Sequence, residues 1–363
     1  MRIALVGNAC SVHIERWVKA LGERGHEVHQ ITANESSGAV SHGSRHMLPF
    51  RPPFGYYLNA IPARVLLGRI QPDLVHAHYA SGYGTLMRLS GYRPYILSVW
   101  GSDVFEYPEI CAANRRRVQK NLFAAGAICS TSHAMVGRVR ELCPDTRDIH
   151  VTPFGVDIKQ FTPRPNEAPR LSVTVGTVKT LNSRYGIDVL IRAFALARGT
   201  LLERHPDLGS RLRLRLVGEG DDKEILRGLA RNLGIGAITT FVGQVSHCSV
   251  AEELRKLDVY VAVSRCAESF GVAVLEASSC GVAVVVSDRG GLPEVVVDGE
   301  TGMVVPAEDV ERTAAALLEL VTEPARAIRM GIDGRRFVER NYNWSRSVDI
   351  MENVYGQFLS ANQ

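Results

Sequence analysis

The chain has 363 residues and a formal net charge of +4, and 45% of its residues are hydrophobic. This length exceeds the roughly 250 to 300 residues at which a single hydrophobic core stops growing, so we expect two domains. The sequence has no run of about 18 apolar residues for a membrane span, and its apolar opening, 1–7, is too short for a signal peptide and is expected to form a strand.

In the first half, short apolar runs alternate with segments of helical period, which is typical of a parallel sheet covered by helices. Ile14, Val18 and Leu21 form a helical stripe that ends at Gly25. Strands are expected near 2–7, 27–32, 73–77, 95–99, 127–131 and 149–152, and further helices near 58–69, 79–90, 110–125 and 132–142. Residues 1–162 are therefore predicted to form one α/β domain.

A proline-rich break follows at Phe161–Pro169, because its prolines cannot sustain a helix or a central strand, and we expect 163–170 to be a linker. The alternation then resumes, which predicts a second α/β domain over 171–343. Strands are expected near 171–176, 212–217, 238–242, 258–263 and 282–286, with a helix from about 187 to 199. The helical pattern from Val310 onward is interrupted near 341–344, which leaves 344–363 as a last helix.

The most informative segment runs from Cys266 to Ala277 and carries two carboxylates, Glu268 and Glu276, eight positions apart. Between them, Phe270–Val272 forms the start of an apolar helix, whose backbone N–H groups would stabilise a phosphate. A strand-to-helix junction of this kind suits a nucleoside diphosphate. The alternative is that Glu268 caps the helix and Glu276 is a solvated surface residue, and the spacing alone leaves both interpretations open.

The surrounding sequence favours the first interpretation. The segment resembles the Glu-x7-Glu motif of the retaining glycosyltransferases of sequence family four, and the similarity extends over 171–306. It includes Phe241–Gly243, Asp258–Ser264, Gly281–Ser287, Gly290–Val296 and Asp298–Gly302. This resemblance implies the GT-B fold, in which two Rossmann-like domains face each other across a cleft. The first domain would bind the acceptor and the second the nucleotide sugar, and the last helix would cross back to pack on the first domain.

Sugar transfer from a nucleoside diphosphate requires the charge of the departing diphosphate to be neutralised. The resemblance implies that cations and helix dipoles do this without a metal. Lys179 stands near the position of the family's Arg, and Arg184 is the nearest candidate for the second cation. The family's Lys commonly precedes a Gly directly, and here Tyr185 stands before Gly186. Both cations could instead be solvated loop charges.

The carboxylates receive separate roles from the same resemblance. Glu268 is expected beside the hydroxyls of the donor sugar and Glu276 on the ribose, because an ionised carboxylate only accepts hydrogen bonds. Retention is expected by front-face return, in which the leaving phosphate helps to deprotonate the acceptor, rather than through a covalent intermediate. The other expected donor-binding residues are Gly218, Gly220, Val242, Ser269, Phe270, Gly271 and Val272.

The acceptor candidates follow strands at their carboxyl ends, where ligands of open α/β sheets bind. We expect Asn8, His78 and Trp100 to bind the acceptor, and Asp103 to join Lys179, Arg184 and Glu268 as a catalytic residue. Relatives often have His-Gly where this chain has Trp100 and Gly101. A histidine at a strand end is also commonly structural.

Charge divides unevenly along the chain. Residues 1–165 contain 19 Lys and Arg against 12 Asp and Glu, and the remainder contains 23 against 26. Two basic segments in the first half, Phe50–Tyr57 and Arg115–Lys120, favour an anionic membrane surface as a partner. The alternative is a solvated basic face.

Seven scattered cysteines without a Cys-x-x-Cys pair argue against disulfides and against a zinc site. We therefore expect a cytoplasmic protein, either free or peripheral on the inner face of the membrane, with no metal, no cofactor and no nucleic-acid partner.

The predicted function is transfer of a sugar from a nucleoside diphosphate, expected to be UDP, to a lipid-linked saccharide in the assembly of a surface polysaccharide or glycolipid such as lipopolysaccharide. The alternatives are transfer to a soluble small molecule and a catalytically silent protein that binds nucleotide sugars. Nucleotide-sugar epimerases and pyridoxal-phosphate phosphorylases share the architecture but explain the Glu-x7-Glu segment less well.

Overall fold

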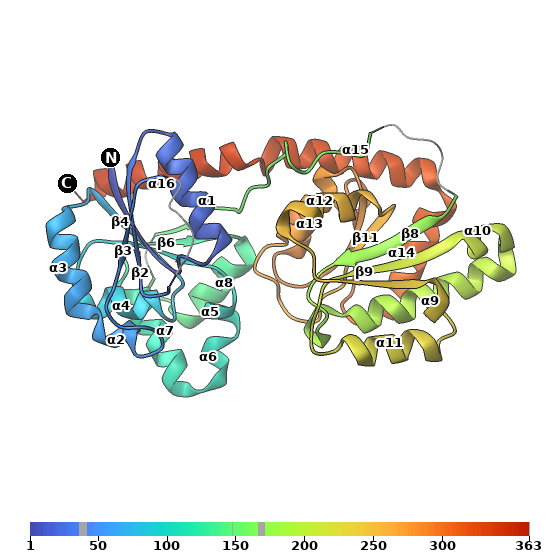
Figure 1. The fold of residues 1–363 in the computed structure, drawn as a ribbon, viewed down its shortest axis with the longest axis horizontal. Helices are drawn as coiled ribbons and strands as arrows, with labels where there is room; N and C mark the ends of the chain where they lie inside the picture. Colours follow the sequence, from blue (N-terminus) through green and yellow to red (C-terminus); the bar gives the residue numbers. More distant parts are fainter. Residues whose placement is uncertain (36–41, 147, 166–170, 363) are drawn as a thin grey trace. The chain divides into compact units, whose positions relative to one another are not determined.

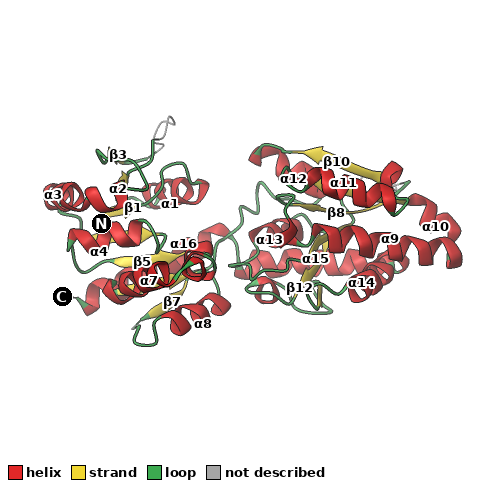
Figure 2. Cartoon of the chain, turned by 90° about the horizontal axis from the view of Figure 1, so that it is seen from below, coloured by secondary structure: helices red, strands yellow, loops and turns green. Residues whose placement is uncertain are grey.

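The computed structural model describes residues 1–35, 42–146, 148–165 and 171–362 (Figure 1). The chain separates into two compact units. Unit 1 comprises Met1–Pro153 and Ser345–Gln363, and unit 2 comprises Phe154–Trp344. In both units the strands of a parallel sheet lie between helices (Figure 2). Both predicted α/β domains are therefore present.

Unit 1 contains a seven-stranded sheet in the order β3-β2-β1-β4-β5-β6-β7. The strands are β1 Arg2–Val6, β2 Glu27–Thr32, β3 Ser44–Met47, β4 Leu74–His78, β5 Ile96–Val99, β6 Ala127–Ser130 and β7 Ile149–Val151. The helices are α1 Val12–Glu23, α2 Gly55–Leu58, α3 Ala60–Ile70, α4 Tyr83–Ser90, α5 Ser102–Phe105, α6 Tyr107–Ile110, α7 Ala112–Ala124 and α8 His133–Leu142, with the C-terminal α16 Trp344–Ala361. Six of the strands match the expected positions. The polar edge strand β3 was missed because its sequence lacks an apolar alternation.

The last helix packs on unit 1, as the resemblance implied. The Nδ1 atom of His76 and the hydroxyl of Tyr355 on α16 form a buried hydrogen bond of 2.8 Å. Glu352 of the same helix accepts hydrogen bonds from Arg24 at 2.6 Å and lies 2.7 Å from His26. Figure 1 shows α16 beside α1. The chain's two ends are thus built into one domain.

Unit 2 contains a six-stranded sheet in the order β10-β9-β8-β11-β12-β13. The strands are β8 Val173–Val178, β9 Leu212–Val217, β10 Thr239–Gly243, β11 Val259–Ala262, β12 Ala283–Ser287 and β13 Met303–Val305. The helices are α9 Ile187–Arg204, α10 Pro206–Arg211, α11 Lys223–Asn232, α12 His247–Arg255, α13 Val272–Ser279, α14 Val310–Thr322 and α15 Pro324–Asn341, with the short 3-10 turns η1 Ser183–Tyr185, η2 Gly236–Ile238 and η3 Leu292–Val295. The three-residue edge strand β13 was not expected from the sequence.

The division between the units falls at Pro153, ahead of the expected boundary at residue 162. Phe161 is only 2% exposed, and its carbonyl accepts hydrogen bonds from the Ser279 hydroxyl at 2.7 Å and from Arg335 at 3.0 Å. These contacts join 154–161 to unit 2. Residues 166–170 of the expected linker lie outside the described residues. Among the described residues, no helix has the length and apolar character to cross a membrane.

Candidate functional site

The sequence-predicted donor residues gather at the carboxyl ends of the unit 2 strands. Lys179 follows β8, Gly218 follows β9, and Val242 lies near the end of β10. The chain enters the sheet at β8, builds β9 and β10 on one side, and then crosses to β11 on the other. This reversal of strand order makes β8 and β11 a topological switch point, where open α/β sheets bind ligands.

Lys179 and Glu268 form an ion pair at this switch point. The Lys179 Nζ lies 2.6 Å from Glu268 Oε2, and the two side chains are only 18% and 12% exposed. The other carboxylate oxygen of Glu268 accepts a short hydrogen bond from the Ser264 hydroxyl. The backbone carbonyl of Glu268 accepts from the Gly291 amide at 2.8 Å. Thus the two residues that the sequence assigned to the leaving diphosphate and to the sugar are in direct contact.

Arg184 lies close to this pair through the ring of Tyr185. The Lys179 ammonium is 4.6 Å and the Arg184 guanidinium 5.4 Å from the centre of that ring, which places both cations in cation–π contact with it. The Arg184 carbonyl accepts from the Arg265 amide at 2.9 Å, so the loop that carries the cations is tied to the segment leading to Glu268. Both predicted cations therefore contact the same ring.

The Gly218–Gly220 turn packs against the backbone of the cation loop. Gly218 has a φ of +140°, and a Cβ atom there would lie 1.9 Å from the Lys179 carbonyl oxygen. A Cβ at Gly220 would lie 2.2 Å from the Leu181 carbonyl oxygen. Only glycine therefore permits this approach. The geometry supports a role for the turn in positioning the Lys179 backbone, and the predicted donor contact of these glycines remains a prediction.

The helix α13 begins beside the ion pair. Gly271, at its N-terminus, has a φ of +112°, and the amides of the first turn of a helix lack acceptors within the helix and carry its positive dipole end. Phe270 is 1% exposed with its ring against Tyr342, so its side chain serves packing and only its backbone can face a ligand. Ser269 and Val272 flank this turn and are half-buried. The segment can bind an anion through its backbone.

Glu276 lies one helical turn further along α13 and is largely buried. Its side chain is 12% exposed, and Glu276 Oε1 is 4.0 Å from the His247 Nε2. Burial, together with the charges of Glu268 and Glu276, raises the pKa of Tyr260 well above its ordinary value. The Tyr260 side chain is fully buried on β11. The charges of both motif carboxylates therefore disfavour ionisation of this buried tyrosine.

Sequence reasoning missed two polar side chains at this site. The first is Ser264, whose hydroxyl binds Glu268. The second is Arg265, which binds both oxygens of Asp188 at 2.7 Å and 2.6 Å and the Ser183 carbonyl at 2.6 Å. Burial opposes ionisation of Asp188, but the Arg265 guanidinium outweighs it and lowers the pKa of the carboxyl. Arg265 lies three residues beyond the end of the buried strand β11, and this position is the signal that could have drawn attention to it.

The predicted acceptor residues of unit 1 lie on neighbouring strand ends. His78 is 1% exposed at the end of β4, with its ring 4.1 Å from the ring of His76 and 5.1 Å from the ring of Trp100, both measured between centres. Burial, with His76 and His13 nearby, lowers the pKa of His78 well below its ordinary value. Within the described residues neither ring nitrogen of His78 has a hydrogen-bond partner. Asn8 is exposed after β1 and accepts from the Cys10 amide at 3.0 Å.

Asp103 is fully buried in α5, which follows β5, and organises the loop between them. Its carboxylate accepts from the amides of Ala80 at 2.7 Å, Trp100 at 3.1 Å and Gly101 at 2.8 Å. Burial raises the pKa of Asp103, and these backbone N–H groups oppose that shift. Both oxygens are thus used to join the loops after β4 and β5. This geometry supports a positioning role, and contact of Asp103 with reacting atoms remains a prediction.

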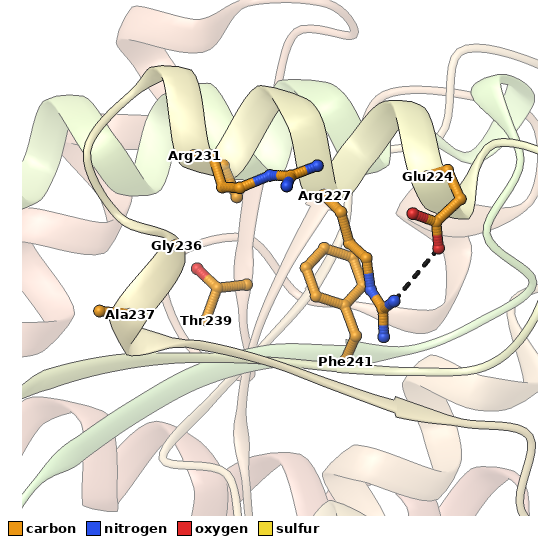
Figure 3. Close-up of a pocket in the computed structure, with 8 residues that line it drawn as sticks. Glu224, Arg227, Arg231, Gly236, Ala237, Thr239 and Phe241 are labelled. Atoms are coloured by element: carbon orange, nitrogen blue, oxygen red, sulfur yellow. Dashed lines mark hydrogen bonds and ion pairs between the residues drawn. The ribbon is translucent and has the colours of Figure 1, made fainter.

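A separate groove of about 500 Å³ lies between α11 and β10 (Figure 3). Arg227 covers the ring of Phe241, with its guanidinium carbon 5.4 Å from the ring centre, and also binds Glu224 at 3.1 Å. Val242 follows Phe241, but neighbouring side chains on a strand point to opposite faces. Since none of the predicted donor residues lines this groove, it is distinct from the candidate site.

Among the described residues, no group of three or more His, Cys, Asp or Glu side chains is arranged to hold a metal ion. The positive groups assembled near Glu268 are Lys179, Arg184 and the N-terminus of α13.

Two protein-family models match this chain, one in each half. Residues 2–132 match "Glycosyl transferase 4-like", and residues 159–337 match "Glycosyl transferases group 1". The second match contains Lys179, Glu268 and Glu276. The candidate donor site therefore lies within the residues that match a glycosyl transferase family.

Named relatives agree with these matches. The chain is 29% identical to the GDP-mannose-dependent alpha-(1-6)-phosphatidylinositol monomannoside mannosyltransferase of Mycolicibacterium smegmatis, over 76% of this chain and 73% of the relative. It is 28% identical to the D-inositol 3-phosphate glycosyltransferase of Stackebrandtia nassauensis, over 96% of this chain and 86% of the relative.

The crystal structure of HepE from Anabaena in complex with UDP and glucose has a similar fold. It superposes with a TM-score of 0.78 over 99% of this chain and all of HepE, at 17% identity. Together with the two parallel sheets, this likeness confirms the expected GT-B architecture of two Rossmann-like domains.

Proposed function

Since the chain is a glycosyltransferase with the GT-B fold, we propose that it transfers a sugar from a nucleoside diphosphate to a lipid-linked saccharide, with retention of configuration and without a metal ion. The observation that carries this proposal is the Lys179–Glu268 ion pair of 2.6 Å at the β8–β11 switch point. It supports the proposal because a cation can neutralise a diphosphate and a carboxylate can accept hydrogen bonds from sugar hydroxyls.

In the proposed donor complex, the leaving diphosphate lies against Lys179, Arg184 and the first amides of α13. These groups lie close together before the donor binds, so they can stabilise the charge that develops on the departing phosphate. The sugar is held by Glu268 and the ribose by Glu276. Because these cations and amides can carry the charge, the proposal does not require a divalent metal.

Retention is proposed to occur without a covalent intermediate. Glu268 already accepts hydrogen bonds from Lys179 and from Ser264, one at each oxygen, and such bonds lower the nucleophilicity of a carboxylate. The leaving phosphate can instead take the proton of the acceptor hydroxyl on the same face of the sugar. The anomeric configuration of the product, measured by NMR, tests this step, and an inverted product would refute it.

The nucleotide of the donor is proposed to be UDP or GDP. The sequence favoured UDP, and the HepE structure contains UDP, whereas GDP-mannose stands in the name of the mycolicibacterial relative. A carboxylate on the ribose and a cation on the diphosphate serve both nucleotides equally. A thermal-shift screen against UDP- and GDP-sugars separates them.

The acceptor is proposed to be a lipid-linked saccharide bound by unit 1 near His78 and Trp100. The name of one relative includes a phosphatidylinositol monomannoside, which supports this class of acceptor. The second candidate is a soluble acceptor, which the inositol phosphate in the name of the other relative supports. Assembly of a glycolipid or surface polysaccharide is the corresponding proposed pathway class.

The experiment is a thermal-shift screen of the full chain against UDP-, GDP-, ADP- and dTDP-sugars, followed by transfer assays with the donor that raises the melting temperature. Ligand binding to the folded state raises its apparent stability, by about 2.7 kcal/mol at a hundredfold excess over Kd. We expect one donor to stabilise the protein and to transfer its sugar to a lipid-linked saccharide. Binding without hydrolysis or transfer would instead identify a catalytically silent sugar-nucleotide-binding protein.

A further inference from the structure

An apolar stripe runs along the outer face of α2 and α3 in unit 1. Phe54, Leu58, Ile61 and Val65 are spaced by four, three and four residues, the spacing of one helical face. Their exposed fractions are 74%, 55%, 76% and 48%, although such side chains are usually buried. The stripe continues past Asn59, where the backbone stays close to helical with φ −82° and ψ 5°. A contiguous exposed patch of this kind marks an interaction surface.

Cations border this stripe. Arg64 and Arg69 are exposed residues of α3, and by their positions in the helix they fall on opposite sides of the apolar positions. On α7 the exposed positions Arg116, Lys120 and Phe123 repeat the combination of basic and apolar groups, with Phe123 67% exposed. The face therefore joins large apolar side chains with positive charge.

Arg117 of α7 reaches the end of the apolar stripe at α2. Its guanidinium carbon lies 5.6 Å from the centre of the Tyr57 ring. This contact joins the segments Phe50–Tyr57 and Arg115–Lys120, which are separate in the sequence. We call the surface of the α2–α3 stripe and the outer side of α7 the basic apolar face.

We propose that the basic apolar face docks on an anionic lipid surface. Large apolar side chains that enter the interface between headgroups and acyl chains, flanked by Lys and Arg that meet anionic headgroups, are the features of an interfacial helix. Charge favours this occupant over a second copy of the chain, because a symmetric contact would bring the arginines of two identical faces together. The purpose of docking, access to a lipid-linked acceptor, rests on the proposed function, whereas the docking itself does not.

The test is co-sedimentation of the full chain with vesicles of phosphatidylcholine alone and with vesicles that also contain phosphatidylglycerol. We expect binding to the anionic vesicles that weakens as salt is raised. The variant Phe54→Ser/Ile61→Ser should bind about tenfold more weakly or worse, because each lost apolar side chain removes a favourable burial. The variant Arg116→Gln/Lys120→Gln should lose about fivefold for each cation on anionic vesicles only.

A matched control is Ile225→Ser on α11 of unit 2, which changes an isoleucine of similar exposure, 71%, outside the basic apolar face. It should bind vesicles like the wild type. Circular dichroism and nucleotide binding verify that all variants fold, since the exposed positions do not contribute to the core.

Undiminished vesicle binding by Phe54→Ser/Ile61→Ser would overturn the proposal. So would light scattering that shows a dimer of the wild type and a monomer of this variant, because a second copy would then occupy the face. Vesicle binding without any nucleotide binding would defeat the proposed function and leave the docking surface in place. Nucleotide binding and transfer without any vesicle binding would overturn the docking proposal and leave the proposed function in place.

Discussion

The ammonium of Lys179 lies 2.6 Å from the carboxylate of Glu268 and joins the end of β8 to the loop before α13. Both side chains are largely shielded from water, so the pair is screened less than a surface ion pair. In the proposed reaction these same groups serve the leaving diphosphate and the sugar. An arriving diphosphate must therefore share Lys179 with Glu268 or displace it, and the pair makes the affinity for nucleotide dependent on Glu268.

Replacing Glu268 with Gln should tighten the binding of the free nucleoside diphosphate and lower transfer. The neutral amide no longer competes for the Lys179 ammonium, and a loss of roughly 1 kcal/mol of competing attraction corresponds to a gain of about fivefold in affinity. Calorimetry with UDP and GDP measures the first effect and initial rates the second. Glu224→Gln, whose side chain is 74% exposed on α11, is the control and should change neither. Weaker binding of the diphosphate to Glu268→Gln would contradict this account of the pair.

Lys179→Ala should mainly lower turnover. Its charge is assigned to the phosphate that leaves, and removal of one such stabilising group costs about 100-fold to 1000-fold in kcat. Initial rates at saturating donor measure this decrease in kcat. The matched control is Lys223→Ala, because Lys223 also pairs with a glutamate, Glu219, at 2.8 Å in the same unit. Unchanged turnover in Lys179→Ala would end the assignment of this cation.

Glu276→Ala should weaken nucleotide binding more than Lys179→Ala does. A hydrogen bond from ribose to a charged carboxylate contributes about 1.5 to 3 kcal/mol, which is roughly 10-fold to 100-fold in Kd. Titration calorimetry of both variants with the same nucleoside diphosphate gives the comparison. An equal or smaller loss in Glu276→Ala would place the ribose elsewhere.

Chelation of divalent metal ions should leave transfer unchanged, because Lys179, Arg184 and the α13 N-terminus are proposed to carry the charge of the diphosphate. The measurement is the initial rate with and without a chelator at saturating donor. A loss of activity that added Mg²⁺ or Mn²⁺ restores would show that the proposal of a metal-independent reaction is wrong.

Acidification should destabilise unit 1 through His76. Burial lowers the pKa of His76 to about 3, from an ordinary 6.5 that holds in the unfolded chain. The unfolded state therefore binds the extra proton first, so stability is complete above about pH 6.5 and falls as the pH drops towards 3. Chemical unfolding between these pH values measures the slope.

The hydrogen-bond partner of His76 provides a variant that tests the same buried site. Tyr355→Phe removes the 2.8 Å hydrogen bond to His76 and should lower the free energy of unfolding by about 1 to 3 kcal/mol at neutral pH. A free energy of unfolding that does not change with pH, in the wild type, would contradict the burial of a neutral His76.

Much of this fold could be predicted from the sequence because its parallel strands are buried. Strands such as β11 and β12 carry buried, almost entirely apolar residues on both faces and are easy to recognise in the sequence. The edge strands β3 and β13 were missed, since a polar or very short edge strand leaves no such pattern. The position of Phe161 in unit 2 also escaped prediction, because it depends on hydrogen bonds from Ser279 and Arg335 far along the chain.

The candidate site was predictable in part. The motif identified Glu268 and Glu276, and the loop after β8 identified Lys179. Their direct contact, and the hydroxyl of Ser264 on the same carboxylate, depend on side-chain directions that a sequence pattern does not specify. Similarly, Asp103 looked like a free carboxylate at a strand end, whereas its oxygens bind the amides of two loops.

The central claim is that unit 2 holds the nucleoside diphosphate of the donor. A crystal of the full chain soaked with UDP or GDP tests it most directly. We expect the diphosphate within hydrogen-bond distance of Lys179 and of the first amides of α13, and the ribose hydroxyls on Glu276. A well-ordered nucleotide bound away from both Lys179 and Glu276, for example in the groove between α11 and β10, would contradict the claim.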